Sequence, residues 1–500
     1  MRAAEEAELA RVPESALMRR AAFGLAIRTA ATLVERTGGV AGRQVALLVG
    51  AGNNGGDALW AGAFLRRRGV AVTAVLLSPD RTHPQGLAAL RRAGGRIAED
   101  LPANADLVLD GIVGLSGKGP LRPAAARLVE AIRVPIIAVD SPSGVDPDTG
   151  TADGPAVIAT ETVTFGARKP VHVLAPWRCG RVHVVDIGLR EQLGEPDLQV
   201  LAPAEIGALW PVPGPTSDKY SQGVLGIAAG SADYPGAAVL STGAAVLATS
   251  GMVRFAGTAA DVVRARWPEV VATGSVADAG QVQAWAVGPG LGTGAAGREV
   301  VAHVLAAGLP VVADADAITL LARHPELADS RDPGTPLVLT PHDREFERLT
   351  GKPPGADRVA ATRDAASRFN AVVLLKGNTT IIAAPDGRML VNPSRSSWPA
   401  TAGSGDVLTG VIGALLAAGL DPPVAAAAAA HAHELAAALA ARPTAACASD
   451  AFWMQNAGMR TSQTADCIQN VATAGAPVPA SAIQTWLTGA IQRLRAEAVR

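Results

Sequence analysis

The sequence has few cysteines, and their arrangement narrows the class of protein. Three cysteines in 500 residues, Cys179, Cys447 and Cys467, show no paired spacing. This excludes a disulfide framework and a thiolate zinc site, and it favours a reducing compartment. The first ten residues carry three glutamates and no apolar run, unlike a secretory signal. We therefore expect a cytoplasmic protein.

Charge of one sign and long apolar runs are also scarce. The 44 basic and 45 acidic side chains leave a net charge of −1 without a long basic stripe, which excludes the usual nucleic-acid-binding surface. The most apolar stretch, 234–253, is interrupted by Pro, Gly, Ser and Thr and lacks the uniform hydrophobicity of a membrane span. We expect neither nucleic acid nor membrane as a partner.

Aromatic residues make up only 3% of the chain, whereas apolar residues make up 49%. The core must therefore consist mainly of Ala, Val and Leu, and most of the chain is expected to be ordered. A length of 500 residues is enough for two to four domains, at roughly 100–200 residues each.

Short β-rich apolar runs alternate with helical patterns in both halves of the chain. The runs are 45–49, 71–77, 107–114, 135–140, 224–230, 284–290, 309–316, 336–343 and 371–382. This alternation predicts parallel, doubly wound sheets whose sites lie at the carboxyl ends of the strands. We predict two α/β domains, 1–205 and 221–500, joined by a Pro-, Gly- and Ser-rich linker at 206–220. Within the second domain, 443–475 shows no clear periodicity and is not assigned.

The first glycine-rich loop, 50–55, matches G-x-G-x-x-G after a strand and before a helix, where backbone N–H groups can hold a pyrophosphate. However, Asn53, Asn54 and Asp57 lie in and just after this loop, and a carboxylate there repels a pyrophosphate in the usual pose. Amide and carboxylate oxygens suit a hard cation instead. The alternative for this segment is a tight turn with a helix cap.

Two further predicted strands of the first half end in an acid. Asp110 precedes a glycine-rich loop that does not match a Walker A sequence, and Asp140 is followed by Ser143. Because the ends of neighbouring parallel strands meet at one edge, Asn54, Asp110 and Ser143 are expected to form a cluster of oxygens. Taken singly, each acid is also compatible with a loop cap.

The segments VGAGNNGGDALWAG, LDGIVGLSGKGP and VDSPSGVDPDTG resemble the three signature loops of the NAD(P)H-hydrate epimerase family, in the same order, over residues 1–205. The resemblance implies a Rossmann-like fold that binds the hydrated nucleotide NAD(P)HX and interconverts its R and S epimers. It also implies Asp140 as the acid/base and a potassium ion on Asn54, Asp110 and Ser143. The implied substrate contacts are Asn53, Asn54, Gly55, Gly56, Asp57, Gly114, Leu115, Ser116, Gly117, Lys118, Gly119 and Pro120. The sequence departs from the family in having Ala58 and Trp60.

In the second half, the segment 401–410 reads TAGSGDVLTG. Its small residues let the backbone approach a phosphoryl group, and the helix that begins here directs its N–H groups at the charge that develops during transfer. Asp406 at that terminus can deprotonate a hydroxyl whose oxygen attacks phosphorus. The alternative is a glycine-rich turn capped by Asp406.

Other residues of the second half are less specific. Lys376 and the residues up to Thr380 suit nucleotide phosphates, but an ordinary turn explains them equally well. His342 is a lone histidine, a kind more often structural than catalytic. His431 and His433 are two residues apart on a predicted helix and do not form an HExxH zinc site.

The segments YPGAAVLSTGAAV, AVGPGLG, VVADADAITLL, LTPHDREFERLTG, LLKGNTTII and ATAGSGDVLTG resemble the ribokinase-like superfamily over 215–440, and more closely its ADP-dependent NAD(P)H-hydrate dehydratase branch. The resemblance implies contacts to NAD(P)HX by Ala238, Gly290, His342 and Asp406. It implies binding of the adenine nucleotide, ADP with Mg²⁺, by Lys376, Gly377, Asn378, Thr379, Thr380 and Gly405. Two departures are HDRE at 342–345 in place of HPGE, and the segment 443–475.

Together the halves predict a bifunctional repair enzyme for hydrated cofactor, composed of an epimerase and a dehydratase that releases AMP and phosphate. A small-molecule kinase of the ribokinase type, a nicotinamide oxidoreductase and a noncatalytic nucleotide sensor stay open as alternatives. The choice between ADP and ATP, and between NADHX and NADPHX, is also open. We expect a homo-oligomer.

Overall fold

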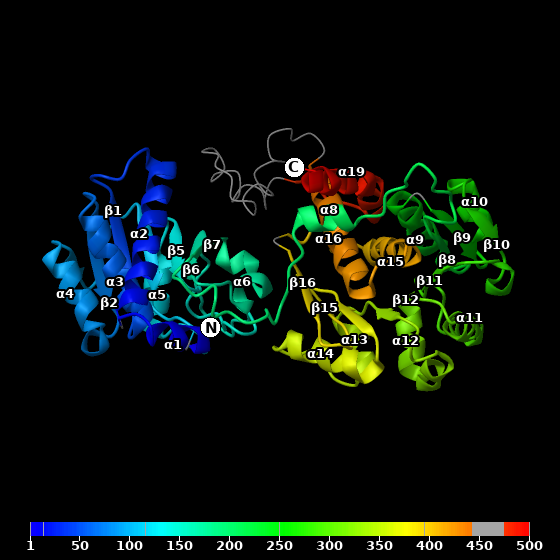
Figure 1. The fold of residues 1–500 in the computed structure, drawn as a ribbon, viewed down its shortest axis with the longest axis horizontal. Helices are drawn as coiled ribbons and strands as arrows, with labels where there is room; N and C mark the ends of the chain where they lie inside the picture. Colours follow the sequence, from blue (N-terminus) through cyan, green and yellow to red (C-terminus); the bar gives the residue numbers. More distant parts are fainter. Residues whose placement is uncertain are drawn as a thin grey trace. The chain divides into compact units, whose positions relative to one another are not determined.

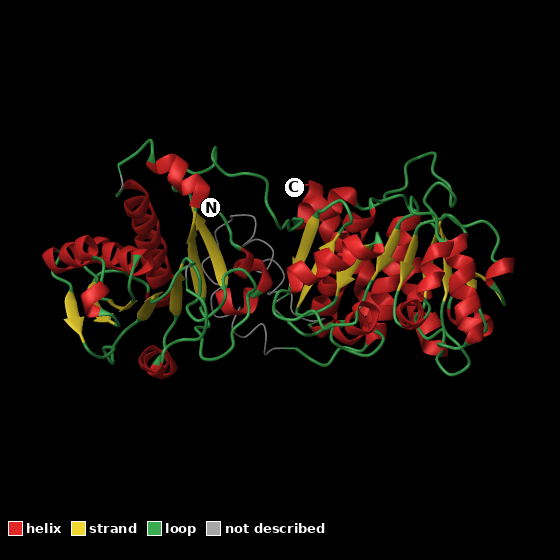
Figure 2. Ribbon diagram, turned by 90° about the horizontal axis from the view of Figure 1, so that it is seen from below, coloured by secondary structure: helices red, strands yellow, loops and turns green. Residues whose placement is uncertain are grey.

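The computed structural model describes residues 2–13, 15–115, 117–249, 251–394, 396–442 and 475–499. The chain divides into two compact units, and the division falls between Pro196 and Asp197 (Figure 1). Each unit has its own sheet and its own buried core. Figure 2 shows the strands of each sheet with helices around them.

The first unit is built on a seven-stranded sheet in the order β3-β2-β1-β4-β5-β6-β7, with every neighbouring pair parallel. The strands are β1 (Gln44–Val49), β2 (Ala71–Leu76), β3 (Arg96–Ala98), β4 (Leu107–Gly111), β5 (Ile136–Val139), β6 (Glu161–Phe165) and β7 (Arg181–Val185). The helices are α1 (Arg2–Leu9), α2 (Ala16–Thr37), α3 (Asn53–Arg66), η1 (Pro79–Arg81), α4 (Pro84–Arg92), α5 (Pro123–Ala131), α6 (Pro170–Leu174) and α7 (Pro176–Cys179).

Alternating side chains of β1 show why this strand appears as one apolar run in the sequence. Leu47 and Val49 pack into the core formed with α2 and α3. Ala46 and Leu48 point to the opposite face, into the core that includes Ala125 of α5. Successive residues of a strand alternate between faces, so a strand covered on both faces is apolar at every position.

The second unit is built on a nine-stranded sheet in the order β10-β9-β8-β11-β12-β13-β14-β15-β16. The strands are β8 (Val224–Ala228), β9 (Met252–Ala256), β10 (Val271–Thr273), β11 (Ala284–Val287), β12 (Val311–Ala313), β13 (Leu337–Leu339), β14 (Val372–Leu375), β15 (Thr379–Ala383) and β16 (Met389–Pro393). The helices are α8 (Pro203–Leu209), α9 (Pro235–Ala248), α10 (Ala260–Arg266), η2 (Val276–Asp278), α11 (Ala295–Ala306), α12 (Asp316–Arg323), η3 (Pro325–Ser330), α13 (Asp343–Thr350), α14 (Arg358–Phe369), α15 (Ser404–Ala417), α16 (Pro422–Ala441) and α19 (Ala480–Val499). The predicted α/β class is confirmed for both units.

The sheet of the second unit is not wholly parallel. The predicted run 371–382 is two strands, because the chain turns at 376–378 and β15 returns antiparallel to β14. β16 then pairs antiparallel with β15. The apolar character continues across the turn, so the hydrophobic pattern does not reveal the reversal.

The predicted linker at 206–220 is wrong in its first part. Ile206 and Trp210 are 1% and 3% exposed and belong to the core of the second unit. The indole Nε1 of Trp210 donates to the carbonyl of Ala248 at 2.9 Å, and Gln199 already pairs with Leu390 beside β16. The second unit thus begins before its first strand, with a segment whose prolines suggested a linker.

Helix α16 of the second unit is long and apolar. By length and composition α16 could cross a membrane, but 72% of its apolar window is buried within the fold, as in the core helix of a globular unit.

Apart from Gly475, the unassigned segment 443–475 lies outside the described residues, as do Cys447 and Cys467. Cys179 is buried.

Candidate functional site

In the first unit, the predicted loops meet at the carboxyl edge of the sheet. The N–H of Gly50, after β1, donates to the carbonyl of Gly111 at 3.0 Å. Asn54, in the first turn of α3, donates from Nδ2 to the carbonyl of Val139 at the end of β5, at 2.8 Å. Three loops that are distant in sequence are therefore joined by direct hydrogen bonds.

Asp110 and Ser143 lie in contact, as the strand-end argument predicted. Asp110 is fully buried. Its Oδ1 accepts from Ser143 Oγ at 2.6 Å and from the Ile112 N–H at 3.3 Å, and its Oδ2 accepts from the Ser143 N–H at 2.8 Å. Burial raises the pKa of Asp110 to about 6, even though the hydrogen bonds from Ser143 favour the carboxylate.

The oxygens at this corner fit the predicted potassium ion in type. Two carboxylate oxygens offer about four acceptor positions, and three are used by the hydrogen bonds to Asp110. Oδ1 of Asn54 faces Gly114, where a methyl group would be 3.0 Å away. Amide, carboxylate and hydroxyl oxygens are ligands for hard cations. Among the described residues, no group of three or more His, Cys, Asp or Glu side chains could hold a metal ion.

Asp140 lies directly after β5 and is held by residues outside the predicted loops. Its Oδ1 accepts from Lys169 Nζ at 2.6 Å and from Thr164 Oγ1 at 2.8 Å. Lys169 Nζ also donates to Thr164 Oγ1 at 2.7 Å and to the carbonyl of Phe165 at 2.9 Å. The lysine and the aspartate are both buried, so their charges attract each other with little screening.

His172 fixes the backbone at Asp140. Its Nδ1 accepts from the N–H of Lys169 at 2.9 Å, so Nε2 carries the proton and donates to the main-chain carbonyl of Asp140 at 2.8 Å. Burial lowers the pKa of His172 to about 4, which keeps the ring neutral. Asp140 has φ 65°, a left-handed conformation that is strained for a residue with a side chain. The surrounding hydrogen bonds hold it there.

Asp57 is the third buried carboxyl group of this region, after Asp110 and Asp140. It lies one turn into α3 and is 8% exposed. Its Oδ1 is buried without a hydrogen-bond partner. Burial raises the pKa of Asp57 well above its usual value, the charges of Asp140 and Glu5 raise it further, and the charge of Lys169 opposes them.

The remaining predicted contacts of the first unit lie in the same loops. Asn53, Gly55 and Gly56 form the first turn of α3. The loop after β4 carries Gly114, Leu115, Gly117, Lys118, Gly119 and Pro120. Lys118 Nζ lies 3.5 Å from Asp148 Oδ2, and both side chains are exposed. Ser116 lies outside the described residues.

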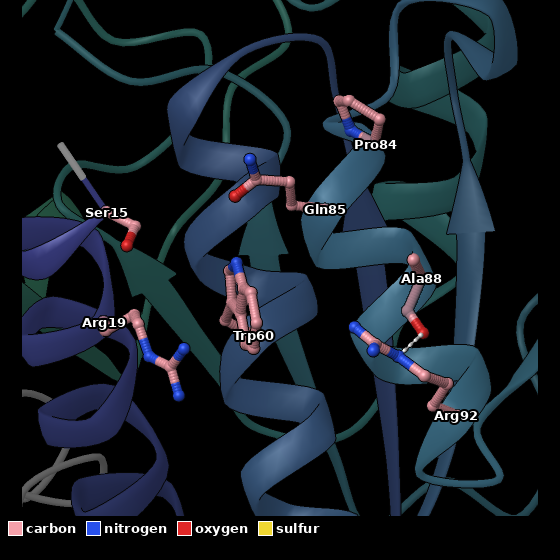
Figure 3. Close-up of a pocket in the computed structure, with 7 residues that line it drawn as sticks. All are labelled: Ser15, Arg19, Trp60, Pro84, Gln85, Ala88 and Arg92. Atoms are coloured by element: carbon pink, nitrogen blue, oxygen red, sulfur yellow. Dashed lines mark hydrogen bonds between the residues drawn. The ribbon is translucent and has the colours of Figure 1, made fainter.

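A cavity of about 380 Å³ lies elsewhere on the first unit, among side chains of α2, α3 and α4 (Figure 3). Trp60 lies between Arg19 and Arg92 in its lining, and the guanidinium carbon of Arg19 is 4.9 Å from the centre of the indole. None of the predicted substrate contacts lines this cavity. The departure at Trp60 therefore affects an outer helix face and leaves the NNGGD turn intact.

In the second unit, the segment 401–410 forms the start of a helix as predicted. Gly403 has φ 82° and is the N-cap of α15, which begins at Ser404. Asp406 lies in the first turn. His433 of α16 contacts this turn through its Nε2, 3.0 Å from Ser404 Oγ.

A partly buried ion pair lies beside this helix start. Lys376 Nζ is 2.7 Å from Asp314 Oδ1, and Thr409 Oγ1 donates to Asp314 Oδ2 at 2.9 Å. A methyl group on Gly405 would be 3.3 Å from Asp314 Oδ2 and 3.4 Å from Lys376 Nζ. Asp314, at the end of β12, was not among the predicted site residues.

The pKa values of the two carboxyl groups of this site, Asp406 and Asp314, shift in opposite directions. Burial raises the pKa of Asp406 to about 7, and the charge of Asp314 adds to the effect against the opposing charge of Lys376. Burial alone would also raise the pKa of Asp314, but Lys376 outweighs burial and holds it below its usual value. At neutral pH Asp406 can therefore both accept and release a proton, the property required of a general base.

The other predicted residues of the second unit have varied surroundings. His342 is the N-cap of α13, where its Nδ1 accepts from the Arg344 and Glu345 N–H groups. Ala238 is fully buried in α9. Gly290 has φ 61°. Gly377 and Asn378 are exposed in the β14–β15 turn, and Thr379 and Thr380 open β15.

Comparison with known proteins finds a family model for each half of the chain. One family model, NAD(P)H-hydrate dehydratase, matches residues 225–453, and another, YjeF-related protein N-terminus, matches residues 14–171. A solved structure, the ADP/ATP-dependent NAD(P)H-hydrate dehydratase from Bacillus subtilis co-crystallised with ATP/Mg²⁺, is 27% identical, with a TM-score of 0.46 over 59% of this chain and 97% of that chain.

Curated relatives match both units together. The bifunctional NAD(P)H-hydrate repair enzyme Nnr of Mycobacterium tuberculosis is 59% identical over 423 residues, which is 84% of this chain and 88% of that enzyme. The enzyme of the same name from Mycobacterium leprae is 58% identical over 444 residues, 88% of this chain and 93% of that enzyme. The chain belongs to the family of bifunctional NAD(P)H-hydrate repair enzymes.

Proposed function

We propose that this chain repairs hydrated nicotinamide cofactors in two reactions. The first unit interconverts R- and S-NAD(P)HX, and the second unit dehydrates S-NAD(P)HX with ADP as the phosphoryl donor. Family membership supports the pair of activities. The observation that carries the proposal is Asp406 in the first turn of α15, beside the Lys376–Asp314 pair. It combines a proton acceptor, a helix N-terminus and a cation, which are the parts used in phosphoryl transfer to a hydroxyl.

Dehydration then proceeds through a phosphate ester. Asp406 removes the proton of the C6 hydroxyl, the oxygen attacks the terminal phosphorus of ADP, and AMP leaves. The ester then loses phosphate while the neighbouring carbon loses a proton, which restores the double bond of the ring. Hydroxide is a poor leaving group and phosphate is a good one, so a kinase-like step accomplishes a net loss of water.

The predicted binding groups have distinct tasks in this scheme. Lys376, Gly377, Asn378, Thr379, Thr380 and Gly405 would bind the adenine nucleotide with its Mg²⁺, and Ala238, Gly290 and His342 would contact NAD(P)HX. Asn54, Asp110 and Ser143 would hold the potassium ion, which supplies positive charge at the loops when bound. Because Lys376 is ion-paired with Asp314, its charge would act on the nucleotide as part of that pair. A cytoplasmic location and a homo-oligomeric state belong to the same proposal.

Epimerisation requires inversion at the carbon that carries both the hydroxyl and the ring nitrogen. The C–N bond can open to give an aldehyde and close again on the opposite face. Opening removes a proton from the hydroxyl and delivers one to the departing nitrogen, so the site needs an acid/base group at that carbon. Asp140, buried and fixed by its neighbours, is proposed for this role.

The test is recovery of the reduced nicotinamide chromophore from a mixture of R- and S-NADHX, with ADP and then ATP. Wild type should recover the whole mixture, Asp140→Ala only the S fraction plus slow spontaneous conversion, and Asp406→Ala none. A stable phosphorylated product without recovered cofactor would instead favour the ribokinase-type kinase. No nucleotide-dependent recovery by the wild type would refute the dehydratase assignment.

A further inference from the structure

We infer that Asp57 and Asp140 form the acid/base pair of the first unit, in which Asp57 donates the proton and Asp140 accepts it, and that Lys169 is the positioning residue that sets these roles. The inference rests on the proposed epimerisation and assigns its proton transfers to individual groups. It also gives a function to Lys169, which lies outside the predicted loops.

The two carboxyl groups have unequal hydrogen-bond partners. Asp140 accepts from Lys169 Nζ at 2.6 Å and from Thr164 Oγ1 at 2.8 Å. Asp57 has a buried Oδ1 with no hydrogen-bond partner. A carboxyl group next to an ammonium favours its ionised form, and a carboxyl group buried without a partner favours its neutral form. Two titratable groups whose environments separate them in this way are the pattern of an acid and a base.

Lys169 is directed at Asp140 and not at Asp57. All three Nζ protons of Lys169 have acceptors, on Asp140, Thr164 and Phe165. The ammonium is thus held toward Asp140 and has no further proton to give to Asp57. The charged groups that act on Asp57 are Asp140, Glu5 of α1 and Lys169, in that order after burial, and two of these three are negative.

Epimerisation needs one proton transfer at the oxygen and one at the nitrogen, and the two carboxyl groups can supply one each. In the open-and-close route, Asp140 takes the hydroxyl proton, the C–N electron pair moves to nitrogen, and Asp57 protonates that nitrogen. The aldehyde turns its other face, nitrogen attacks it, Asp57 recovers its proton, and Asp140 returns its proton to the oxygen. Every proton is restored, so no other reactant is needed. The two atoms served are bonded to one carbon, which requires neighbouring carboxyl groups.

The experiment compares the full-length wild type with Asp57→Asn, Lys169→Met, Lys169→Arg and the control Asp100→Asn, an exposed carboxylate after β3. R-to-S conversion is followed across pH, and dehydration of pure S-NADHX by the same preparations reports on the integrity of the chain. We expect Asp57→Asn to lose about 10²- to 10⁴-fold in epimerisation, the range for one general acid, and to lack the alkaline limb of the rate profile.

The lysine variants test the positioning role. Lys169→Met should lower kcat for epimerisation with little change in KM, because the ammonium that holds Asp140 Oδ1 is absent, and Lys169→Arg should restore part of kcat. A merely structural lysine would lower kcat only in proportion to the loss of folded first unit, which an unfolding curve reports. The infrared spectrum of the wild type minus that of Asp57→Asn should show a protonated carboxyl band at neutral pH, because Asp406, whose pKa is about 7, contributes equally to both spectra.

The outcomes separate the inference from the proposed function. A wild type that does not interconvert the epimers overturns the epimerase proposal together with this assignment. An active wild type with a fully active Asp57→Asn variant overturns the assignment alone. The same holds if the difference spectrum lacks the carboxyl band, or if Lys169→Arg restores none of the kcat that Lys169→Met loses.

Discussion

In the first unit the carboxylate paired with a lysine, Asp140, follows a strand, and its unpaired neighbour Asp57 lies in a helix of the same site. In the second unit Asp314 follows a strand and pairs with Lys376, while Asp406 lies at the start of a helix. The parts are alike, but the proposed base differs: it is the strand-end carboxylate in the first unit and the helical carboxylate in the second.

In both units burial raises the pKa of the helical carboxyl group and the charge of the lysine opposes this rise. In the first unit Lys169 has three acceptors around Asp140, and the pKa of Asp57 rises well above its usual value through burial. In the second unit the charge of Lys376 also opposes the effect of burial on Asp406, whose pKa reaches about 7. A helical carboxyl group thus becomes an acid in one case and a base near neutrality in the other.

The largest expected effect is the selective loss of one of the two activities. Asp406→Asn should reduce dehydration about 10³-fold or more, within the upper part of the range for a general base, and leave epimerisation unchanged. Asp140→Asn should do the reverse. The measurements are cofactor recovery from pure S-NADHX with ADP and R-to-S conversion without nucleotide. Loss of both activities in either variant would show that the sites are not independent.

Asp421→Asn is the matched control for the second unit. This carboxylate is the N-cap residue of α16 and pairs with Arg388 on the surface. Surface ion pairs contribute at most about 1 kcal/mol, so both activities should stay at the wild-type level.

The second prediction concerns the ion pair of Lys376 and Asp314 in the second unit. Lys376→Met leaves Asp314, which is 2% exposed, as a buried charge without its cation, and such a change costs about 3–5 kcal/mol. Because the folded-state pKa of Asp314 is depressed, the stabilisation by this pair is present above the unfolded pKa and is lost as pH falls through the folded pKa. Urea unfolding at neutral and acidic pH should show a wild-type minus variant difference that shrinks on acidification.

The position of residues at strand ends predicts part of the first site from the sequence. Asn54, Asp110 and Ser143 were predicted together because neighbouring parallel strands end at one edge, and Asp110 and Ser143 are in contact. Applied to 161–165, the same rule would have directed attention to Thr164, but that run was not among the predicted strands. The hydrogen bonds between Asp140 and the residues after β6 cannot be read from spacing.

The sequence pattern did not reveal Asp314 as a site residue of the second unit, because its partner is distant in the chain. Lys376 was assigned to phosphate binding because of its turn, yet its partner Asp314 lies 62 residues away. The segment VVADADAITLL contains two aspartates, and only the end of β12 distinguishes Asp314 from the other. Likewise, α8 resembled a linker because proline and glycine content does not report whether Ile206 and Trp210 pack against a distant helix.

The third prediction is the pH dependence of dehydration. Since the base must be ionised and the pKa of Asp406 is about 7, the rate should rise with pH through about 7 and fall about tenfold per unit below it. Lys376 opposes this elevation of the pKa, so Lys376→Arg, which keeps the charge, should leave the midpoint close to that of the wild type. A rate independent of pH from 5.5 to 8.5, roughly one and a half units on either side of that pKa, would contradict Asp406 as the base.

The smallest expected effects come from Thr164→Val and Thr409→Val. These substitutions compare a carboxylate that reacts, Asp140, with one that holds a lysine, Asp314. Thr164 Oγ1 donates to Asp140 Oδ1 at 2.8 Å, and Thr409 Oγ1 donates to Asp314 Oδ2 at 2.9 Å. Thr409→Val removes one hydrogen bond to a charged group, a change of about 1.5–3 kcal/mol. Thr164→Val removes two, because Thr164 Oγ1 also accepts from Lys169 Nζ. Because Asp140 reacts, Thr164→Val should lower epimerisation by about tenfold or more.

Because Asp314 only holds Lys376, Thr409→Val should appear mainly as lower stability of the second unit, with a smaller change in the rate of dehydration. Unfolding curves and the two separate assays on both variants provide the comparison. A larger catalytic effect for Thr409→Val than for Thr164→Val would mean that Asp314 contacts the reacting atoms, and the second site would then use both of its carboxylates, as the first does.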